Sequence, residues 1–108
     1  MVFQVGAALL DACILAILLQ EDAYGYVLTQ SVKEVLFVSE STLYPVLRRL
    51  QKEGCLIAYD LPFSGRNRRY YQITELGKGN LDGYIREWRD YKGRVDKILS
   101  GGELSEPA

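Results

Sequence analysis

The sequence contains no histidine, and it has only two cysteines and one tryptophan among its 108 residues. Without histidine, the chain lacks the commonest general base and the usual activator of a serine or cysteine nucleophile. Cys13 and Cys55 lie far apart and form neither a CxxC motif nor a metal-ligand spacing. Glu53, Asp60 and Glu75 are scattered carboxylates that suggest no acid and base pair. We therefore expect no enzyme active site, no metal site and no cofactor.

The two thiols lie in apolar sequence without an adjacent cation. Reactive cysteines need an electropositive, partly exposed environment, so the alternative role of a redox sensor is disfavoured. We expect Cys13 and Cys55 to be reduced core residues of a cytosolic protein.

Long hydrophobic runs and an excess of one charge are also absent. The most apolar stretch, residues 13–19, is too short to span a bilayer, and no signal-peptide pattern precedes it. The 13 basic and 14 acidic side chains give a net charge of −1. This balance excludes a uniformly basic nucleic-acid-binding protein but leaves room for a local basic patch. The length predicts one domain, whose modest core would benefit from oligomerisation. The reduced cysteines and the lack of a membrane-spanning run or signal-peptide pattern predict a cytoplasmic protein without membrane contact.

Hydrophobic spacing predicts four helices and one β-hairpin. The helices are expected at residues 5–20, 23–34, 39–53 and 75–99, and the strands at residues 55–61 and 68–73. Asp22 and Thr74 are the predicted N-caps of the second and last helices. Ser39 and Ser41 both suit the third, and Pro45 favours Ser41 because proline is best tolerated near a helix start.

Two connecting segments complete this outline. Residues 35–38 are too few for a helix and predict either a brief strand or a buried connector. Residues 62–67 contain proline, glycine and arginine, which predicts a loop at an arginine-rich hairpin tip.

The first and last helices suggest a dimer. Between Gly6 and Leu19 the only charge is Asp11, and a helix apolar on nearly all sides must be covered on most of them. The last helix carries apolar residues at alternating gaps of three and four, the pattern of a heptad seam. The predicted dimer interface comprises Leu9, Leu10, Ile14, Leu81, Trp88, Tyr91, Val95 and Ile98.

The order of helix, helix-turn-helix and hairpin predicts a mainly α fold with a small β-hairpin wing. This is a winged helix-turn-helix followed by a C-terminal dimerisation helix. We divide it into a DNA-binding domain at 1–73, a dimerisation helix at 74–100 and a flexible tail at 101–108.

Charge is distributed in agreement with DNA binding. Residues 39–73 carry six basic and three acidic side chains, a net charge of +3, whereas residues 1–38 carry −3 and residues 74–108 carry −1. A winged helix presents its third helix and its wing to DNA, and both lie in the basic segment. Because Leu43, Leu47 and Leu50 face inward, the opposite side of the third helix faces solvent. The predicted DNA-binding residues are Ser39, Ser41, Thr42, Tyr44, Pro45, Arg48, Arg49, Lys52, Gly65, Arg66, Asn67 and Arg68.

Three segments carry a family resemblance, and together they cover roughly residues 9–78. They are YGYVLTQSVKE from Tyr24, SESTLYPVLRRLQKEGCLIAY from Ser39 and GRNRRYYQITELGK from Gly65. The chain resembles the PadR family of bacterial transcriptional regulators, and STLYPVLRRLQKEG together with RRYYQITELGK is specific. The resemblance implies a homodimeric repressor that binds a pseudo-palindromic operator through two copies of the third helix.

Some short PadR members release DNA when a planar compound binds at the dimer interface. In the multidrug-sensing type a tryptophan of the last helix stacks on the ligand, and Trp88 in YIREWRDYKGRV matches it. An acid follows that tryptophan by four residues in the drug-sensing type, whereas Lys92 stands here, which argues against a cationic drug. The resemblance implies a small aromatic or phenolic effector, and we assign Tyr84, Ile85, Trp88 and Tyr91 to its site.

Two alternatives remain open from sequence. Trp88 is either a ligand platform or a core anchor that seals the dimer, and both roles can coexist. The winged helix either binds specific DNA or serves as a protein–protein adaptor, and the salt dependence of DNA affinity separates these functions.

Overall fold

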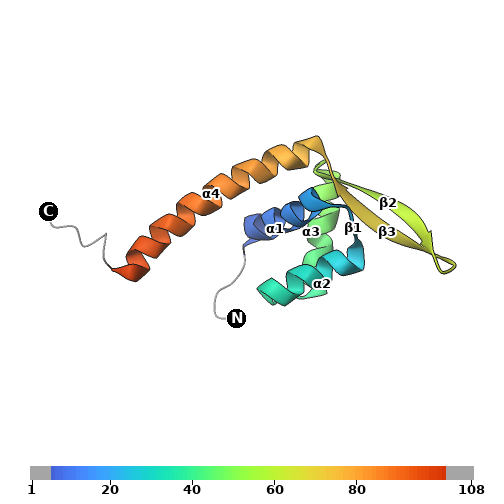
Figure 1. Ribbon diagram of the computed structural model, residues 1–108, viewed down its shortest axis with the longest axis horizontal. Coiled ribbons are helices and arrows are strands. Elements are labelled where there is room, and N and C mark those ends of the chain that lie inside the picture. The colour runs from blue at the N-terminus through green and yellow to red at the C-terminus, as the bar shows by residue number, and fades with distance from the viewer. Residues whose placement is uncertain (1–5, 102–108) are drawn as a thin grey trace.

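The computed structural model describes residues 6–101. Figure 1 shows a long final helix and a hairpin extending from opposite ends of a helical centre. The elements are α1 Ala7–Gln20, β1 Ala23–Tyr24, α2 Gly25–Leu36, α3 Glu40–Lys52, β2 Leu56–Phe63, β3 Arg66–Ile73 and α4 Glu75–Ser100. This order confirms the predicted winged helix-turn-helix followed by a C-terminal helix. The predicted flexible tail lies outside the described residues except for Gly101, which caps α4 with φ 75°.

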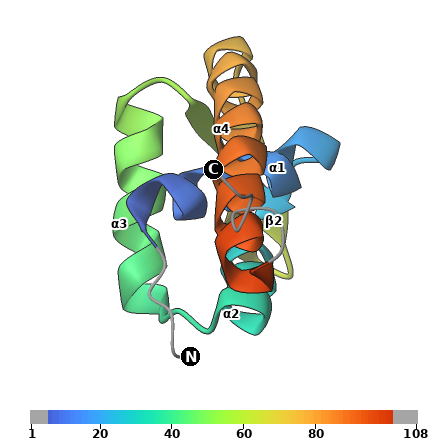
Figure 2. The same cartoon turned by 90° about the vertical axis from the view of Figure 1, so that its left-hand side faces the viewer.

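Helix α1 lies at the centre of the fold. It packs against the other three helices and against β3, as Figures 1 and 2 together show. Leu10, Ile14, Leu15 and Leu18 are buried there. Full burial of such a side chain contributes about 1.5–3 kcal/mol, so these residues make α1 a large contributor to the common core on which α3 and α4 pack.

The sheet has three antiparallel strands in the order β1-β3-β2. The short strand β1 was not predicted, and Asp22 is not the N-cap of α2. Helix α2 begins at Gly25, because Ala23 and the next residue pair with β3. The Asp22 carboxylate accepts hydrogen bonds from the Tyr59 hydroxyl at 2.5 Å and from Gln72 Nε2 at 3.2 Å. Asp22 therefore ties β1 to the hairpin.

The hairpin is longer and its turn tighter than predicted. The prediction of a six-residue loop at 62–67 is wrong, because Pro62 pairs with Asn67 within the β2–β3 ladder. Strand β2 is an edge strand, where a proline is tolerated because it removes no hydrogen bond that a neighbouring strand needs. Only Ser64 and Gly65 remain in the turn, both at positive φ (49° and 78°), as a type I′ turn requires.

Helix α3 starts at Glu40, with Ser39 as its N-cap; the preference for Ser41 was wrong. The Ser39 hydroxyl accepts from the Thr42 backbone N–H at 3.3 Å. Pro45 lies inside the helix, on its exposed side.

Leu43, Leu47 and Leu50 are buried as predicted. The segment 35–38 forms no strand: α2 continues to Leu36, and Phe37 caps it in the left-handed region with φ 56°. The residues after Phe37 form the connector to α3.

Helix α4 begins as predicted, after Thr74. The Thr74 hydroxyl accepts from the Gly77 backbone N–H at 3.1 Å and donates to the Gly54 carbonyl oxygen at 2.6 Å. A Cβ at Gly77 would overlap the carbonyl oxygen of Cys55, so glycine permits the close approach of α4 to the start of β2. Leu81 is buried in the same core as α1, so the first turns of α4 belong to the core of the winged helix. No helix within residues 6–101 is long and apolar enough to cross a membrane.

Candidate nucleic-acid interface and effector groove

The solvent-facing side of α3 is polar. Its leucines pack inward, which leaves Ser41, Thr42, Pro45, Arg48 and Lys52 exposed on the other side, while Tyr44 is half-buried. This distribution confirms that the side opposite the leucines faces solvent.

Side chains of α2 and the N-cap hold the start of α3 in place. Glu40 accepts from Gln30 Nε2 at 2.8 Å and pairs with Lys33 Nζ at 3.5 Å, both on α2. The Ser39 hydroxyl hydrogen-bonds the hydroxyls of Ser41 and Thr42 at 2.9 and 3.0 Å. Ser39 therefore orders the first turn, and the other two hydroxyls lie at the helix surface. Figure 2 shows α3 beside α1 and joined to α2 by the short connector.

The basic residues of segment 39–73 fall into two groups. Arg49 pairs with Asp11 and Glu53, and Arg69 pairs with Asp60 at 3.6 Å. The remaining four make no ion pair with any of residues 6–101; they are Arg48, Lys52, Arg66 and Arg68. Sequence alone did not distinguish the paired arginines from these four, because the partner Asp11 is distant in the chain.

Arg68 is engaged in a different way from the other three. Its guanidinium carbon lies 3.6 Å from the ring centroid of Phe63 and 4.7 Å from that of Tyr24. Such cation–π contacts hold the charge on the face of the sheet. Arg66 and Asn67, the first residues of β3, are exposed beside the Gly65 turn. Among the basic side chains of the hairpin, Arg66 is therefore the one with neither an ion pair nor a cation–π contact within residues 6–101.

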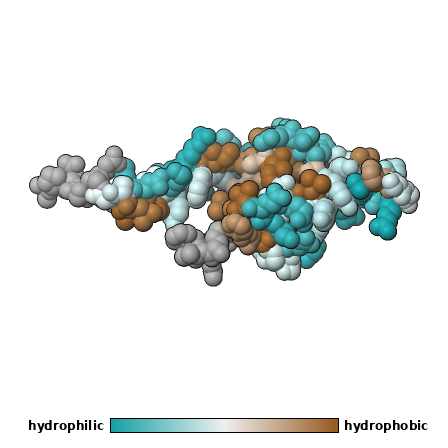
Figure 3. Space-filling view, turned by 60° about the horizontal axis from the view of Figure 1, so that its bottom comes forward, coloured by the Kyte–Doolittle hydropathy of each residue, from teal (hydrophilic) through white to brown (hydrophobic). Residues whose placement is uncertain are grey.

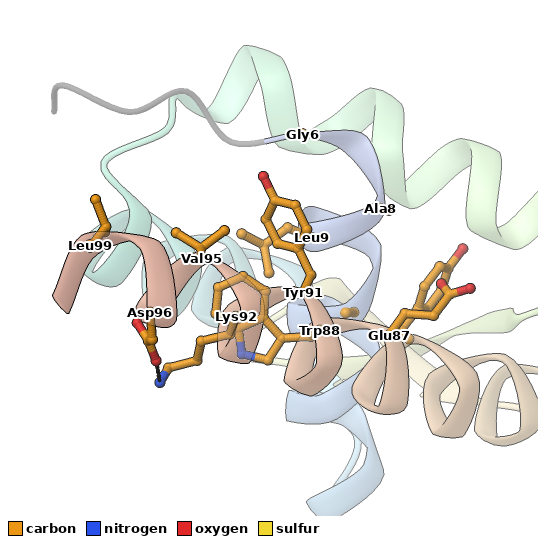
Figure 4. A pocket seen from close by; sticks show the side chains of 12 residues that line it. Gly6, Ala8, Leu9, Glu87, Trp88, Tyr91, Lys92, Val95, Asp96 and Leu99 are labelled. Atoms are coloured by element: carbon orange, nitrogen blue, oxygen red, sulfur yellow. Dashed lines mark hydrogen bonds and ion pairs between the residues drawn. The ribbon is translucent and has the colours of Figure 1, made fainter. Parts of the chain in front are cut away.

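A groove of about 840 Å³ runs between α1 and α4. In Figure 4, Tyr91 and Val95 project from α4 toward Leu9 of α1, and Trp88 lies along the α4 wall. Trp88 is 44% exposed in this open groove. The full lining is Gly6, Ala8, Leu9, Ala12, Tyr84, Glu87, Trp88, Tyr91, Lys92, Val95, Asp96 and Leu99.

The groove contains three of the four predicted effector residues. Ile85 does not line it and instead packs against the core. The sequence predicted a ligand between the first and last helices, but it assigned no residue of α1, and neither Glu87 nor Asp96, to the effector site. Lys92 Nζ pairs with Asp96 Oδ2 at 2.9 Å, which offsets the lysine charge beside the groove.

Residues 14–83 match the family described as transcriptional regulator PadR-like. The chain belongs to the PadR-like family. A Streptococcus mutans protein of known structure is 40% identical and superposes with a TM-score of 0.86, covering 94% of this chain and 95% of the other.

Two further solved structures are similar to this PadR-like chain. A PadR family transcription regulator of Clostridium difficile is 33% identical with a TM-score of 0.76, covering 83% of this chain and 97% of the other. A PadR-like transcriptional regulator of Bacillus cereus is 36% identical with a TM-score of 0.76, covering 83% and 90%. The protein is thus a winged-helix, DNA-binding transcriptional regulator. The family match includes α3 and the wing, but the residues that line the groove all lie before residue 14 or after residue 83, outside the match.

The predicted dimer residues of the PadR-like chain separate into two sets. Leu10, Ile14 and Leu81 are 4%, 1% and 2% exposed, so they are core residues of the protomer and unavailable to a partner. The prediction was wrong for these three because α1 and α4 pack together and bury these side chains in the core of their own chain. The others lie on accessible or half-buried surface, and they are Leu9, Trp88, Tyr91, Val95 and Ile98.

One buried polar cluster escaped sequence analysis. Asp11 is the one charged side chain buried among residues 6–101, at 3% exposure. It accepts from Arg49 Nη2, and this bond is the main cause that raises the arginine pKa. The Tyr84 hydroxyl donates to Asp11 Oδ2 at 3.4 Å. Burial, and then the Asp11 carboxylate, raises the Tyr84 pKa, so the phenol stays protonated and able to donate. The sequence did contain a signal for this cluster: Asp11 is the only charge in an apolar helix, and a buried charge requires a partner.

The cysteines are free thiols. Cys55 is buried and its sulfur accepts from Asn80 Nδ2 at 3.3 Å, whereas Cys13 is half-buried. Burial raises the pKa of the Cys13 thiol. A raised pKa leaves less thiolate near neutral pH and lowers reactivity.

Proposed function

We propose that this regulator is a homodimeric repressor acting in the bacterial cytoplasm. Helix α3 and the hairpin tip bind operator DNA, and a small planar aromatic or phenolic compound in the α1–α4 groove releases it. The main support for the DNA contact is that some basic side chains of residues 39–73 form ion pairs while others do not. Arg48, Lys52 and Arg66 are exposed without an ion pair among residues 6–101, and DNA phosphates supply the missing countercharge.

Each part of the surface has a distinct role. The first turn of α3, with Ser41 and Thr42, reaches base edges or phosphates in the major groove, while Arg48 and Lys52 bind phosphates. The wing contacts the backbone or minor groove through Arg66. Two protomers place their α3 helices in successive major grooves, roughly one helical turn apart. We leave Arg49 out of this surface because Asp11 and Glu53 engage its guanidinium.

The test of DNA binding is fluorescence anisotropy with the protein's own upstream promoter DNA and with scrambled DNA, across a salt series. Arg66→Ala is compared with Arg69→Ala, which changes the charge equally on the same hairpin but removes a cation already paired with Asp60. If Arg66 binds one phosphate per protomer, its loss lowers the salt slope by about 1.8 per dimer, since each contact contributes about 0.9.

Equal effects of the two hairpin variants would contradict the proposed surface. Weak binding that ignores both sequence and salt would instead favour the protein–protein adaptor. Transcription in vitro from the bound promoter then tests repression, and an increase on adding the protein would contradict a repressor.

The dimer proposal is supported by exposed apolar side chains on α4. Trp88, Tyr91, Ile98 and Leu99 are 44%, 59%, 64% and 77% exposed. Figure 3 shows apolar surface in the middle of the molecule and again near the far end of α4. Large exposed apolar side chains on one helix favour an interaction site, and a second α4 helix is the partner that the heptad spacing predicts.

Sedimentation velocity measures the dimer, and Trp88→Ala tests the two roles of the tryptophan. A weaker dimer indicates an anchor, whereas an intact dimer that no longer binds a planar probe indicates a ligand platform. Arg89→Ala, the next residue on the same helix, is the control, and it should change neither property. A wild-type monomer at micromolar concentration would contradict the homodimer.

The effector proposal is supported by the aromatic, largely apolar lining of the groove. Flat rings stack on indole and phenol side chains, and a groove of this volume suits a small ligand. The probe is 2-naphthol, a planar phenol, with the cation acridine orange for comparison, and Trp88 quenching reports binding. We expect 2-naphthol to quench Trp88 and to weaken DNA binding. Quenching without a change in DNA affinity, or no quenching by either probe, would contradict release by such a ligand.

A further inference from the structure

A single buried carboxylate joins the α1–α4 groove to α3, which we call the recognition helix because it carries the proposed contacts to DNA bases. Asp11 projects from α1 and uses its two oxygens for two different elements. Oδ1 accepts from Arg49 of α3, and Oδ2 accepts from the hydroxyl of Tyr84 of α4. Among the residues that the structure describes, these are the hydrogen-bond donors to the Asp11 side chain.

Each donor lies on a helix that carries one of the proposed functional surfaces. Tyr84 lines the groove one helical turn before Trp88. Arg49 lies next to Arg48 in the recognition helix, and its Nη1 donates to Glu53 at 3.2 Å at the end of that helix. The distance from a groove wall to the DNA-facing helix is therefore spanned by one side chain.

Burial makes this connection sensitive to either end. A carboxylate at 3% exposure cannot replace a lost hydrogen bond with one to bulk water. If one donor is lost, the remaining hydrogen bond becomes the only compensation for the buried charge within residues 6–101, and its geometry should change. The Tyr84 bond at 3.4 Å is the longer and weaker of the two, so it is the contact that breaks first.

We propose that Asp11 couples the groove to the recognition helix. An occupant that moves Tyr84 changes the position of Arg49 and of the last turn of α3, and DNA bound to α3 changes the position of Tyr84 in return. The inference rests on the proposed function, because it assigns a regulation to that site. Coupling between two binding sites is reciprocal, so it can be measured from the DNA side without an effector.

The experiment uses Trp88, the only tryptophan, as the reporter in the groove wall. Fluorescein-labelled promoter duplex is titrated into the full-length protein, with anisotropy measuring DNA binding, and unlabelled duplex is used to follow Trp88 emission. In the wild type we expect both signals to change at the same DNA concentrations. In Tyr84→Phe, which removes only the hydroxyl, DNA should still bind while the Trp88 response falls about fivefold or more.

Tyr26→Phe is the matched control. It removes an exposed tyrosine hydroxyl from α2, outside the groove lining, and no hydrogen bond joins that hydroxyl to Asp11. Its Trp88 response should equal that of the wild type. Asp11→Asn keeps the shape but not the charge and should also lose the response, so it serves if Tyr84→Phe does not fold. Urea unfolding of each variant separates loss of coupling from loss of stability.

The outcomes distinguish this inference from the proposed function. DNA binding without a Trp88 response in the wild type would overturn the coupling and leave DNA binding intact. A full response in Tyr84→Phe and Asp11→Asn, or an equal loss in Tyr26→Phe, would also overturn it. Absence of DNA binding by the wild type would overturn both proposals.

Discussion

The pair of Asp11 and Arg49 should respond unequally to removal of its two members. Arg49→Met keeps an apolar stem but leaves the carboxylate, 3% exposed, with the Tyr84 hydroxyl as its remaining partner. Asp11→Asn leaves an arginine whose side chain is 40% exposed and still paired with Glu53. The charge left behind is therefore buried in the first variant and solvated in the second.

The expected costs follow from this difference. Leaving a buried charge unpaired costs about 3–5 kcal/mol, and we expect Arg49→Met to lie at the lower end because one hydrogen bond remains. For Asp11→Asn we expect about 1 kcal/mol, since water and Glu53 screen the remaining cation. Arg48→Met, an exposed neighbour without an ion pair among residues 6–101, should stay within about 0.5 kcal/mol.

Urea unfolding followed by circular dichroism measures these free energies. The protomer concentration must be held constant, because stability of a dimer depends on it. A larger loss for Asp11→Asn than for Arg49→Met would refute the reasoning, because the buried carboxylate would then not be the group that needs compensation.

Three further predictions concern local packing, capping and thiol chemistry. Gly77→Ala should lower the free energy of unfolding by about 1–3 kcal/mol because its Cβ overlaps the Cys55 carbonyl, whereas Gly79→Ala, which meets nothing within 4 Å, should raise it by up to about 1 kcal/mol. Thermal unfolding checks this pair, and equal effects would contradict the close approach. Ser39→Ala should cost about 1 kcal/mol and Ser41→Ala less, and the reverse order in urea unfolding would contradict the assigned N-cap. Cys13 should react with iodoacetamide more slowly in the native protein than in the unfolded chain, because burial raises its pKa; mass spectrometry of the modified peptide measures both rates, and equal rates would contradict this protection.

Local patterns were sufficient to predict most of the architecture. The apolar stripe of Leu43, Leu47 and Leu50 placed the inner side of α3, and the cap at Thr74 placed the start of α4. These signals are short in range: a helix face and an N-cap depend on residues within a few positions of one another. The basic segment 39–73 likewise identified α3 and the hairpin as the elements that we propose to face DNA.

Where prediction failed, the deciding contact joined residues distant in the chain. Asp22 resembled an N-cap, yet Tyr59 and Gln72 of the hairpin bind its carboxylate. Pro62 resembled a loop residue, but its place on an edge strand allows it to stay within the ladder. No local pattern carries this information, because strand order and edge position exist only after the chain has folded.

By itself, the sequence determined the winged-helix order, the basic recognition segment and the aromatic stripe of the last helix, all of which depend on periodicity and composition. Tertiary structure alone decided which arginines form ion pairs within residues 6–101 and which apolar residues stay exposed. Arg49 and Arg48 are neighbours in sequence with identical chemistry, yet only Arg49 lies within reach of Asp11 on α1. Leu81 and Tyr91 share one seam, yet α1 covers the first and leaves the second 59% exposed. Burial and ion pairing depend on contacts between elements, and those are set by packing.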